Sequence, residues 1–192
     1  LILILLTLVS CAGTKAPLHD EIVKSAIDLS LAYTGSGQYE DALRTYNTAL
    51  EQVEDYRLTY NKVLTIWASG AHDNAIAACR EAIVQYPYIM HFRTLLVSFY
   101  EHLADMNALE VHNRVYLGRN LYTIETERFP DHGYLKLCAG ELEDILVLNP
   151  GNTEVRNRLI EIYETAEDPA KAYEHALFLW NQGIRTERII TV

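Results

Sequence analysis

The sequence predicts an all-α solenoid of helix-turn-helix hairpins, and two observations carry this prediction. The first is an internal repeat: Gly37 and Gly70 lie 33 residues apart, and each is followed by four residues and an alanine. A period of about 20 to 50 residues is typical of solenoids, in which each unit buries its faces against its neighbours. The second is the spacing inside the repeat, where apolar residues recur every three or four positions, as on one face of a helix.

The first unit shows this spacing on both sides of a glycine-containing turn. Leu29 and Tyr33 precede the turn, and Ala42, Tyr46 and Ala49 follow it. The small alanines allow the two helices to approach closely, while the larger side chains fill the space between neighbouring units. The segment is expected to form one helical hairpin.

The second and third units continue in the same register. The second unit is marked by Ala75, Cys79, Ala82 and Pro87. The third has Ala108, again 33 residues further on, and Val115 seven residues after it. Beyond Ala108 the register loosens, so either the turn is shortened or one helix runs over residues 107–128. Phe129-Pro130 is expected to break the chain there.

The last two units are recognised by their ends and turns. The fourth closes with Leu148-Asn149-Pro150, after Gly133, Cys138, Leu142 and Ile145. The fifth turns at Asp168-Pro169, and its apolar positions are Leu159, Tyr163, Ala172, Ala176 and Leu179. About five hairpins would then cover residues 20–183. An apolar tail over residues 184–192 either folds back as a cap or leaves the last hairpin exposed.

This pattern resembles the tetratricopeptide repeat, a helix-turn-helix unit of about 34 residues. The family pattern has a leucine and a tyrosine in the first helix, a central alanine, an aromatic residue four positions later and a second alanine. The resemblance implies a right-handed superhelical solenoid. It also implies that partners bind to the concave surface, which is lined by the first helix of each hairpin.

The resemblance implies a set of groove residues, position by position. They are Ile27, Leu31, Arg57, Tyr60, Leu64, Trp67, Met90, Arg93, Val97 and Tyr100. The groove would start apolar and aromatic and would end acidic. Binding is expected to centre on Tyr60, Trp67, Arg93 and Tyr100, because Trp, Tyr and Arg dominate many interfaces. In the alternative, Trp67 and Tyr100 pack between hairpins.

The apolar run Leu1–Val9 at the start of the chain has the length of the apolar core of a secretory signal and is too short to span a membrane. Leu8-Val9-Ser10-Cys11 resembles the lipobox of bacterial lipoproteins. This resemblance implies a signal peptide over residues 1–10, truncated at its start, and a lipidated Cys11 in a linker over residues 11–19. It further implies a protein held by acyl chains such as palmitate in the bacterial cell envelope, at the outer membrane facing the periplasm. The alternative is a truncated membrane anchor whose cysteine is incidental.

Charge and composition bound the function. The net charge of −10 argues against nucleic acid as a partner, because phosphate-backbone binding needs clustered Lys and Arg. The seven histidines lack the spacing of metal ligands, and no catalytic constellation is visible, so we expect no metal, no cofactor and no enzymatic activity. Cys79 and Cys138 are expected to be small buried side chains, with a disulfide between them as the alternative in an oxidising compartment.

Two functions fit these expectations. The first is an envelope-anchored scaffold that binds another envelope protein or a peptide segment through its groove. The second is a periplasmic carrier that holds a hydrophobic small ligand and passes it to a transporter. An open groove would favour the scaffold, and a closed dry pocket would favour the carrier.

Overall fold

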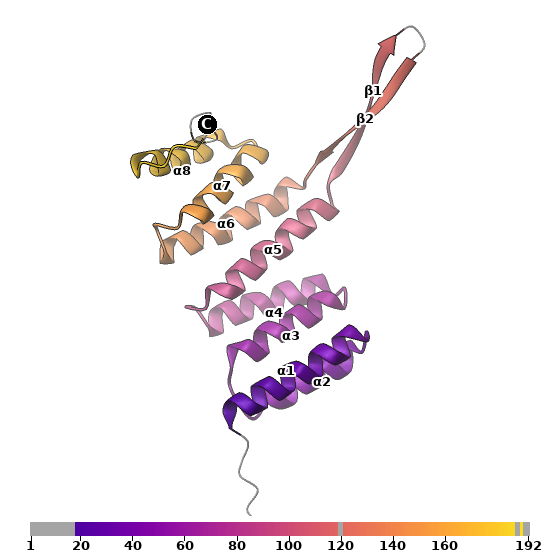
Figure 1. Ribbon diagram of the computed structural model, residues 1–192, viewed down its shortest axis with the longest axis vertical. Helices are drawn as coiled ribbons and strands as arrows, with labels where there is room; N and C mark the ends of the chain where they lie inside the picture. The colour runs from indigo at the N-terminus through magenta and orange to yellow at the C-terminus, as the bar shows by residue number, and fades with distance from the viewer. Residues whose placement is uncertain (1–17, 119–120, 187–188, 190–192) are drawn as a thin grey trace, which may run out of the picture. The chain divides into compact units, whose positions relative to one another are not determined.

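The computed structural model describes residues 18–118, 121–186 and 189 (Figure 1). Cys11 and the apolar start of the chain lie outside these residues, so the signal peptide and the lipidation stay predictions. The chain forms two compact units, Leu1–Thr65 and Ile66–Val192. The boundary between them falls inside one helix, α3 (Tyr56–Ala68).

The first unit is a helical hairpin followed by most of α3. The hairpin consists of α1 (His19–Gly35) and α2 (Tyr39–Leu50). The buried cluster of the unit consists of Val23 and Ala26 of α1, Tyr46 and Ala49 of α2, and Leu58 of α3. This confirms the predicted first hairpin, with one correction: Leu29 is 47% exposed. The buried face of α1 is shifted around the helix to Val23, Ala26 and Ser30.

The glycines that mark the repeat are the ones that its turns require. Gly37 has φ 77° and Gly70 has φ 84°, in the left-handed region that residues with a Cβ adopt at a cost. At the first turn, the backbone N–H of Gln38 donates to the carbonyl of Tyr33 at 2.8 Å and ends α1. The regular spacing of glycine therefore reports the spacing of the turns.

The second unit contains the end of α3 and five further helices. These are α4 (His72–Gln85), α5 (Met90–Met106), α6 (His132–Leu148), α7 (Thr153–Thr165) and α8 (Pro169–Asn181). Each helix from α4 to α8 packs on the next one. The most deeply covered is α5, which buries Phe92, Leu95, Leu96, Val97, Phe99, Tyr100, Leu103 and Ala104.

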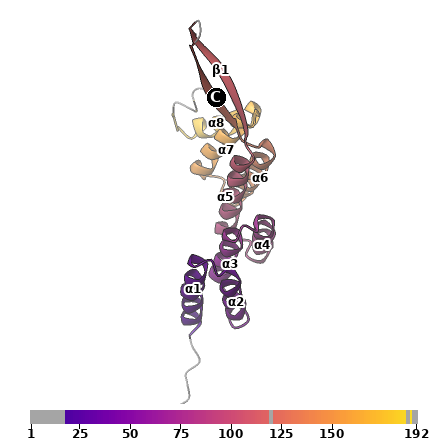
Figure 2. The same cartoon turned by 90° about the vertical axis from the view of Figure 1, so that its right-hand side faces the viewer.

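The prediction of helix in residues 107–128 is wrong, because residues 109–118 and 121–129 form strands. β1 (Leu109–Gly118) and β2 (Leu121–Phe129) pair as an antiparallel hairpin, which we call the arm. The arm projects from the junction of α5 and α6, away from the helices of its own unit (Figures 1 and 2). The segment is rich in Val, Thr, Tyr and Ile, which favour strands, and the 33-residue interval to Ala108 coincides with the repeat without continuing it.

The arm changes the number of hairpins. The predicted third and fourth units each supply one helix, α5 and α6, and these pack together as one hairpin with the arm inserted between them. In the described part of the chain, the helix-turn-helix fold is confirmed: α1–α2, α5–α6 and α7–α8 each pack as a hairpin within a unit, and the turn at Gly70 joins α3 to α4. Eight described helices allow at most four hairpins in place of about five. The turn at Asp168-Pro169 is confirmed, since the Asp168 side chain accepts a hydrogen bond from the backbone of Lys171 at the start of α8.

Both cysteines of the described chain are free and buried. The Cys79 thiol donates to the carbonyl of Phe92 at 3.2 Å, and the Cys138 thiol donates to that of Val97 at 3.6 Å. Burial raises the pKa of both thiols to about 12. They are small side chains that pack against the backbone of α5, as the first interpretation predicts, and they form no disulfide.

At the end of the chain, Ile184 donates its backbone N–H to the carbonyl of Leu179, and Arg185 lies over the ring of Trp180. Ile189 is buried. No helix among the described residues is both long enough and apolar enough to cross a membrane.

Candidate functional site

The predicted groove residues are divided between the two units. In the first unit, Ile27 packs against the buried cluster and Leu31 is exposed. Tyr60 and Leu64 are half-buried on α3. These side chains lie on α1 and α3, as the resemblance implies. Ile27, however, packs inside the first unit and is partly buried there.

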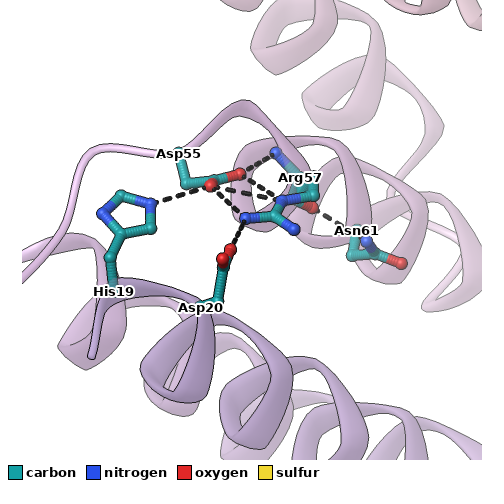
Figure 3. A network of polar contacts seen from close by, with 5 residues as sticks. All are labelled: His19, Asp20, Asp55, Arg57 and Asn61. Atoms are coloured by element: carbon teal, nitrogen blue, oxygen red, sulfur yellow. Dashed lines mark hydrogen bonds and ion pairs between the residues drawn. The ribbon is translucent and has the colours of Figure 1, made fainter. Parts of the chain in front are cut away.

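Arg57, the cation predicted in this part of the groove, is held by two carboxylates (Figure 3). Its terminal nitrogen donates to Asp55 Oδ2 at 2.7 Å and to Asp20 Oδ1 at 2.7 Å. Asp55 also accepts from the backbone N–H of Arg57 at 2.8 Å, and its Oδ2 lies 2.9 Å from His19 Nε2. The network joins the start of α1 to the start of α3, so the Arg57 side chain makes its contacts within the first unit.

Asp55 is the central group of this network. Its side chain is almost fully covered, whereas that of Asp20 is exposed. The hydrogen bonds from the Arg57 guanidinium, helped by His19, hold the pKa of the Asp55 carboxyl well below its ordinary range, although burial acts in the opposite direction.

In the second unit, Trp67 and Tyr100 contribute to internal contacts. Trp67 stacks on Phe99 with ring centroids 3.9 Å apart and on His72 at 4.2 Å. Tyr100 is 2% exposed, and its hydroxyl accepts a hydrogen bond from Arg80 at 2.6 Å. Both side chains therefore pack against other helices, which is the alternative that the sequence left open, and Tyr100 is not presented to a partner.

Met90 and Val97 do line a cleft, together with residues that the sequence did not single out. The cleft has a volume of about 580 Å³, and we call it the α5–α7 cleft. It is lined by Tyr88, Met90, Thr94, Val97, Leu142, Ile145, Leu148, Asn149, Asn152, Glu154, Val155 and Arg158. These residues come from the loop before α5, the first half of α5, the end of α6, the loop after it and the start of α7.

Helical spacing explains why these side chains converge. Met90, Thr94 and Val97 are three or four positions apart and share one face of α5. Leu142, Ile145 and Leu148 share one face of α6 in the same way. The floor of the cleft is buried and apolar, since Val97, Leu142 and Ile145 are covered, while Tyr88 and Leu148 at the mouth are exposed.

The loop between α6 and α7 positions the start of α7, which forms the third wall of the cleft after α5 and α6. The Asn152 side chain accepts a hydrogen bond from the backbone of Val155 at 3.1 Å and thereby starts α7 beside the end of α6. Val155 and Arg158 then face the cleft one turn apart. The sequence pattern Leu148-Asn149-Pro150 indicated the end of a repeat, but nothing in it indicated that this end lines a cleft.

Two arginines at and beside the cleft are already paired. Arg158 forms a two-pronged ion pair with Glu101, in which its Nε donates at 2.8 Å. Arg93, a predicted groove residue, contacts Glu141 at 2.8 Å and Asp144 at 2.7 Å, so one cation faces two carboxylates. Glu154 at the rim is exposed and forms no ion pair among the described residues. The surroundings of the cleft are therefore net acidic.

A second polar cluster joins α6, α7 and α8 away from the cleft. His175 is buried, and its Nε2 lies 3.0 Å from Glu143 Oε1 while its Nδ1 lies 3.2 Å from an Arg156 nitrogen. Arginine can only donate, so Nδ1 accepts, and Nε2 must carry the proton donated to Glu143. These contacts join α6, α7 and α8 and hold the last hairpin in place.

The chemistry of the α5–α7 cleft suits binding. Its apolar floor accepts aliphatic or aromatic side chains, and its polar rim offers amide and carboxylate groups for orientation. In the part of the chain that the structure describes, no group of three or more His, Cys, Asp or Glu side chains is arranged to hold a metal ion.

The Asp55 network predicts a pH-dependent contribution to stability. Asp55→Asn should lower the free energy of unfolding at pH 7 by about 1.5–3 kcal/mol, because the bonds from Arg57 lose their charged acceptor. The native pKa is depressed, so this stabilisation is present above the unfolded pKa of about 3.9 and disappears as the pH falls. Urea unfolding of both proteins at pH 7 and pH 3 should show the difference shrinking at the lower pH.

Asp20→Asn is the matched control, since Asp20 bonds the same guanidinium from an exposed position. It should leave the free energy of unfolding almost unchanged at both pH values. Equal losses for the two variants would show that Asp55 is not the central group.

The comparisons with known proteins agree with this architecture. Residues 27–88 match the model of the tetratricopeptide repeat family. No curated protein matched the chain. A tetratricopeptide repeat protein from Parabacteroides merdae has 13% identity and a TM-score of 0.56 over 88% of this chain and 56% of its own. The chain thus spans little more than half the length of that protein.

MamA from Desulfovibrio magneticus, residues 41 to the end, is also similar in structure. It has 14% identity and a TM-score of 0.51, over 82% of this chain and 73% of its own. At these identities, the likeness concerns the fold alone. Together with the family match, it identifies residues 27–88 as tetratricopeptide repeats and the fold of the chain as the fold of that family.

Proposed function

We propose that the chain is a scaffold, anchored in the bacterial envelope through Cys11, that binds another envelope protein through the α5–α7 cleft. The tetratricopeptide repeat fold is that of a protein-interaction scaffold. The observation that carries the choice of site is the cleft itself: an apolar floor of Val97, Leu142 and Ile145 that opens to solvent between three helices.

The partner that fits this cleft is a segment with apolar side chains on one side. An amphipathic helix or an extended peptide can place two or three such side chains on the floor. Because the surroundings are net acidic, a basic residue next to the apolar ones would be favoured. Tyr88, in the loop before α5, and Met90, at the start of α5, are the contact residues that we propose here instead of Trp67 and Tyr100.

The volume of the cleft supports the carrier as a second candidate. About 580 Å³ lies within the usual range for small-ligand pockets, about 300 to 1,000 Å³. Native mass spectrometry of the protein taken gently from envelope extract separates the two functions. A bound mass of a few hundred daltons would favour the carrier, and a stoichiometric protein partner would favour the scaffold.

Leu148→Lys tests the site. Leu148 lines the mouth of the cleft and is 48% exposed, so a lysine there adds a charge at the opening without disturbing the core. We expect the partner, once captured, to bind about tenfold or more weakly, which is at least 1.4 kcal/mol, because an apolar contact at the mouth is replaced by a charge. Isothermal titration calorimetry measures the change.

Val147→Lys is the control, because Val147 precedes Leu148 on the same helix, is 77% exposed and does not line the cleft. It should bind the partner within about twofold of the wild-type protein. A loss of similar size in both variants, or in neither, would contradict the assignment of the cleft.

Cys11→Ser tests the anchor. If acyl chains on this cysteine hold the protein, the variant should move from the membrane fraction to the soluble fraction, because each buried CH₂ contributes about 0.8 kcal/mol to membrane binding. Fractionation of cells that express the full gene product measures this. A variant that stays with the membranes would overturn lipid anchoring at Cys11.

A further inference from the structure

The arm has two open edges. β1 and β2 form a two-stranded antiparallel sheet in the described structure, and its described contacts with a helix lie at its base, where Arg128 of β2 bonds Asp105 of α5. The strands have 10 and 9 residues, whereas strands of about 5–6 residues are most common. The backbone groups along the outer edges are therefore available for pairing over an unusual length.

The base of the arm is held firmly. The Arg128 guanidinium donates to the backbone carbonyl of Asp105 at 2.7 Å and lies 3.1 Å from its carboxylate. The backbone N–H of Asp131 donates to the carbonyl of Ala104 at 2.9 Å. The arm is thus fixed to the end of α5, and Figure 1 shows it extending away from the helices of its unit.

An isolated two-stranded sheet lacks what makes a sheet stable in water. Three or more strands with a covered face are usually needed. Open edges are templates for a further strand, and proteins often block them with proline or a covering segment. Neither strand contains a proline. A third strand would pair the backbone N–H and C=O groups of the open edge and increase the surface that the sheet buries.

The chemistry of the β2 edge indicates which strand would fit. Glu125 and Glu127 alternate along β2, so they share one face, and both are exposed and form no ion pair among the described residues. The positions opposite them on β1 are Asn113 and Val111, which carry no charge. Glu110 on β1 differs, because Arg128 lies opposite it with the charged groups 3.8 Å apart. Among the arm carboxylates whose side chains the structure describes, Glu125 and Glu127 of β2 are therefore the two without a counter-charge.

Apolar side chains flank these two carboxylates. Phe129 lies two positions after Glu127 on the same face, and Ile124 lies on the other face just before Glu125. Both are exposed. Opposite-charge and apolar cross-strand pairs stabilise an antiparallel pairing, and like charges directly opposite one another weaken it.

We propose that the β2 edge binds an extended basic segment of another protein as a third, antiparallel strand. The segment would have a basic residue opposite Glu127, another opposite Glu125, and apolar residues opposite Phe129 and Ile124. Read along the partner, the pattern is apolar, any, basic, any, basic, apolar. Backbone hydrogen bonds would hold the strand, and the alternating side chains would give it specificity. This surface is independent of the α5–α7 cleft.

The test uses a fluorescent peptide, Val-Thr-Lys-Thr-Lys-Val, and the full chain, with fluorescence anisotropy as the readout. The wild-type protein should bind it saturably. The double variant Glu125→Lys/Glu127→Lys should bind about tenfold more weakly, because two opposite-charge pairs become like-charge pairs. The same variant should prefer Val-Thr-Glu-Thr-Glu-Val, which reverses the specificity.

Two controls separate strand addition from general attraction between opposite charges. Glu81→Lys/Glu174→Lys changes two exposed helical residues, alters the net charge equally and should leave binding unchanged. A peptide that is N-methylated at the alternate amides facing the edge keeps its charge but loses those donors, and should not bind.

Any of four results would overturn the proposal: no saturable binding to the wild-type protein, unchanged binding to the arm variant, equal loss in the helical control, or binding of the N-methylated peptide.

Sedimentation equilibrium of the chain alone tests whether a second copy of the chain occupies the β2 edge instead. We expect no self-association through the arm. A dimer that Thr126→Pro dissociates would show that the edge belongs to a second copy. The Leu148→Lys variant should bind the peptide normally, which distinguishes this surface from the cleft.

Discussion

The burial of α5 is the constraint on which the second unit depends. This helix is covered along most of its length, and the neighbours on both sides approach it through small side chains. Cys79 of α4 donates its thiol to the backbone of α5 at Phe92, and Cys138 of α6 does the same at Val97. Such contacts need a side chain no larger than cysteine, because a bulkier one would push the helices apart. The raised pKa of both thiols follows from the same close approach.

Because α5 is fixed between its neighbours, its two ends can carry different surfaces. The start of α5 supplies Met90, Thr94 and Val97 to the α5–α7 cleft, where the end of α6 and the start of α7 supply the other walls. The end of α5 carries the base of the arm through the contacts of Asp105 with Arg128. One helical hairpin thus presents an apolar cleft at one end and a two-stranded sheet at the other. In the first unit, the Asp55 network plays a comparable positioning role.

The sequence predicts the helical hairpins well, because the turns at Gly37 and Gly70 need glycine and the contacts between helices need alanine or cysteine at fixed places. It fails at residues 107–128, where Ala108 falls on the repeat interval by coincidence and the strand-forming residues that follow outweigh it. The cleft is predicted in part: Met90 and Val97 follow from the first-helix rule. Leu142, Ile145 and Leu148 do not follow from that rule, because they lie on α6, the second helix of its hairpin. The cleft also depends on the loop between α6 and α7, whose course no local sequence pattern predicts. Tyr100 is predicted to line the groove but is buried, because an aromatic side chain on a helix can pack in a core as readily as it can line a groove.

Native-state hydrogen exchange of the α5 backbone amides tests this account most directly. If the burial of α5 holds the second unit together, the amides from Leu95 to Leu103 should exchange only through unfolding of the whole unit. Their opening free energies should then equal the free energy of unfolding of that unit, while the amides of the arm exchange through local openings. Amides of α5 that exchange as readily as those of the arm would contradict it.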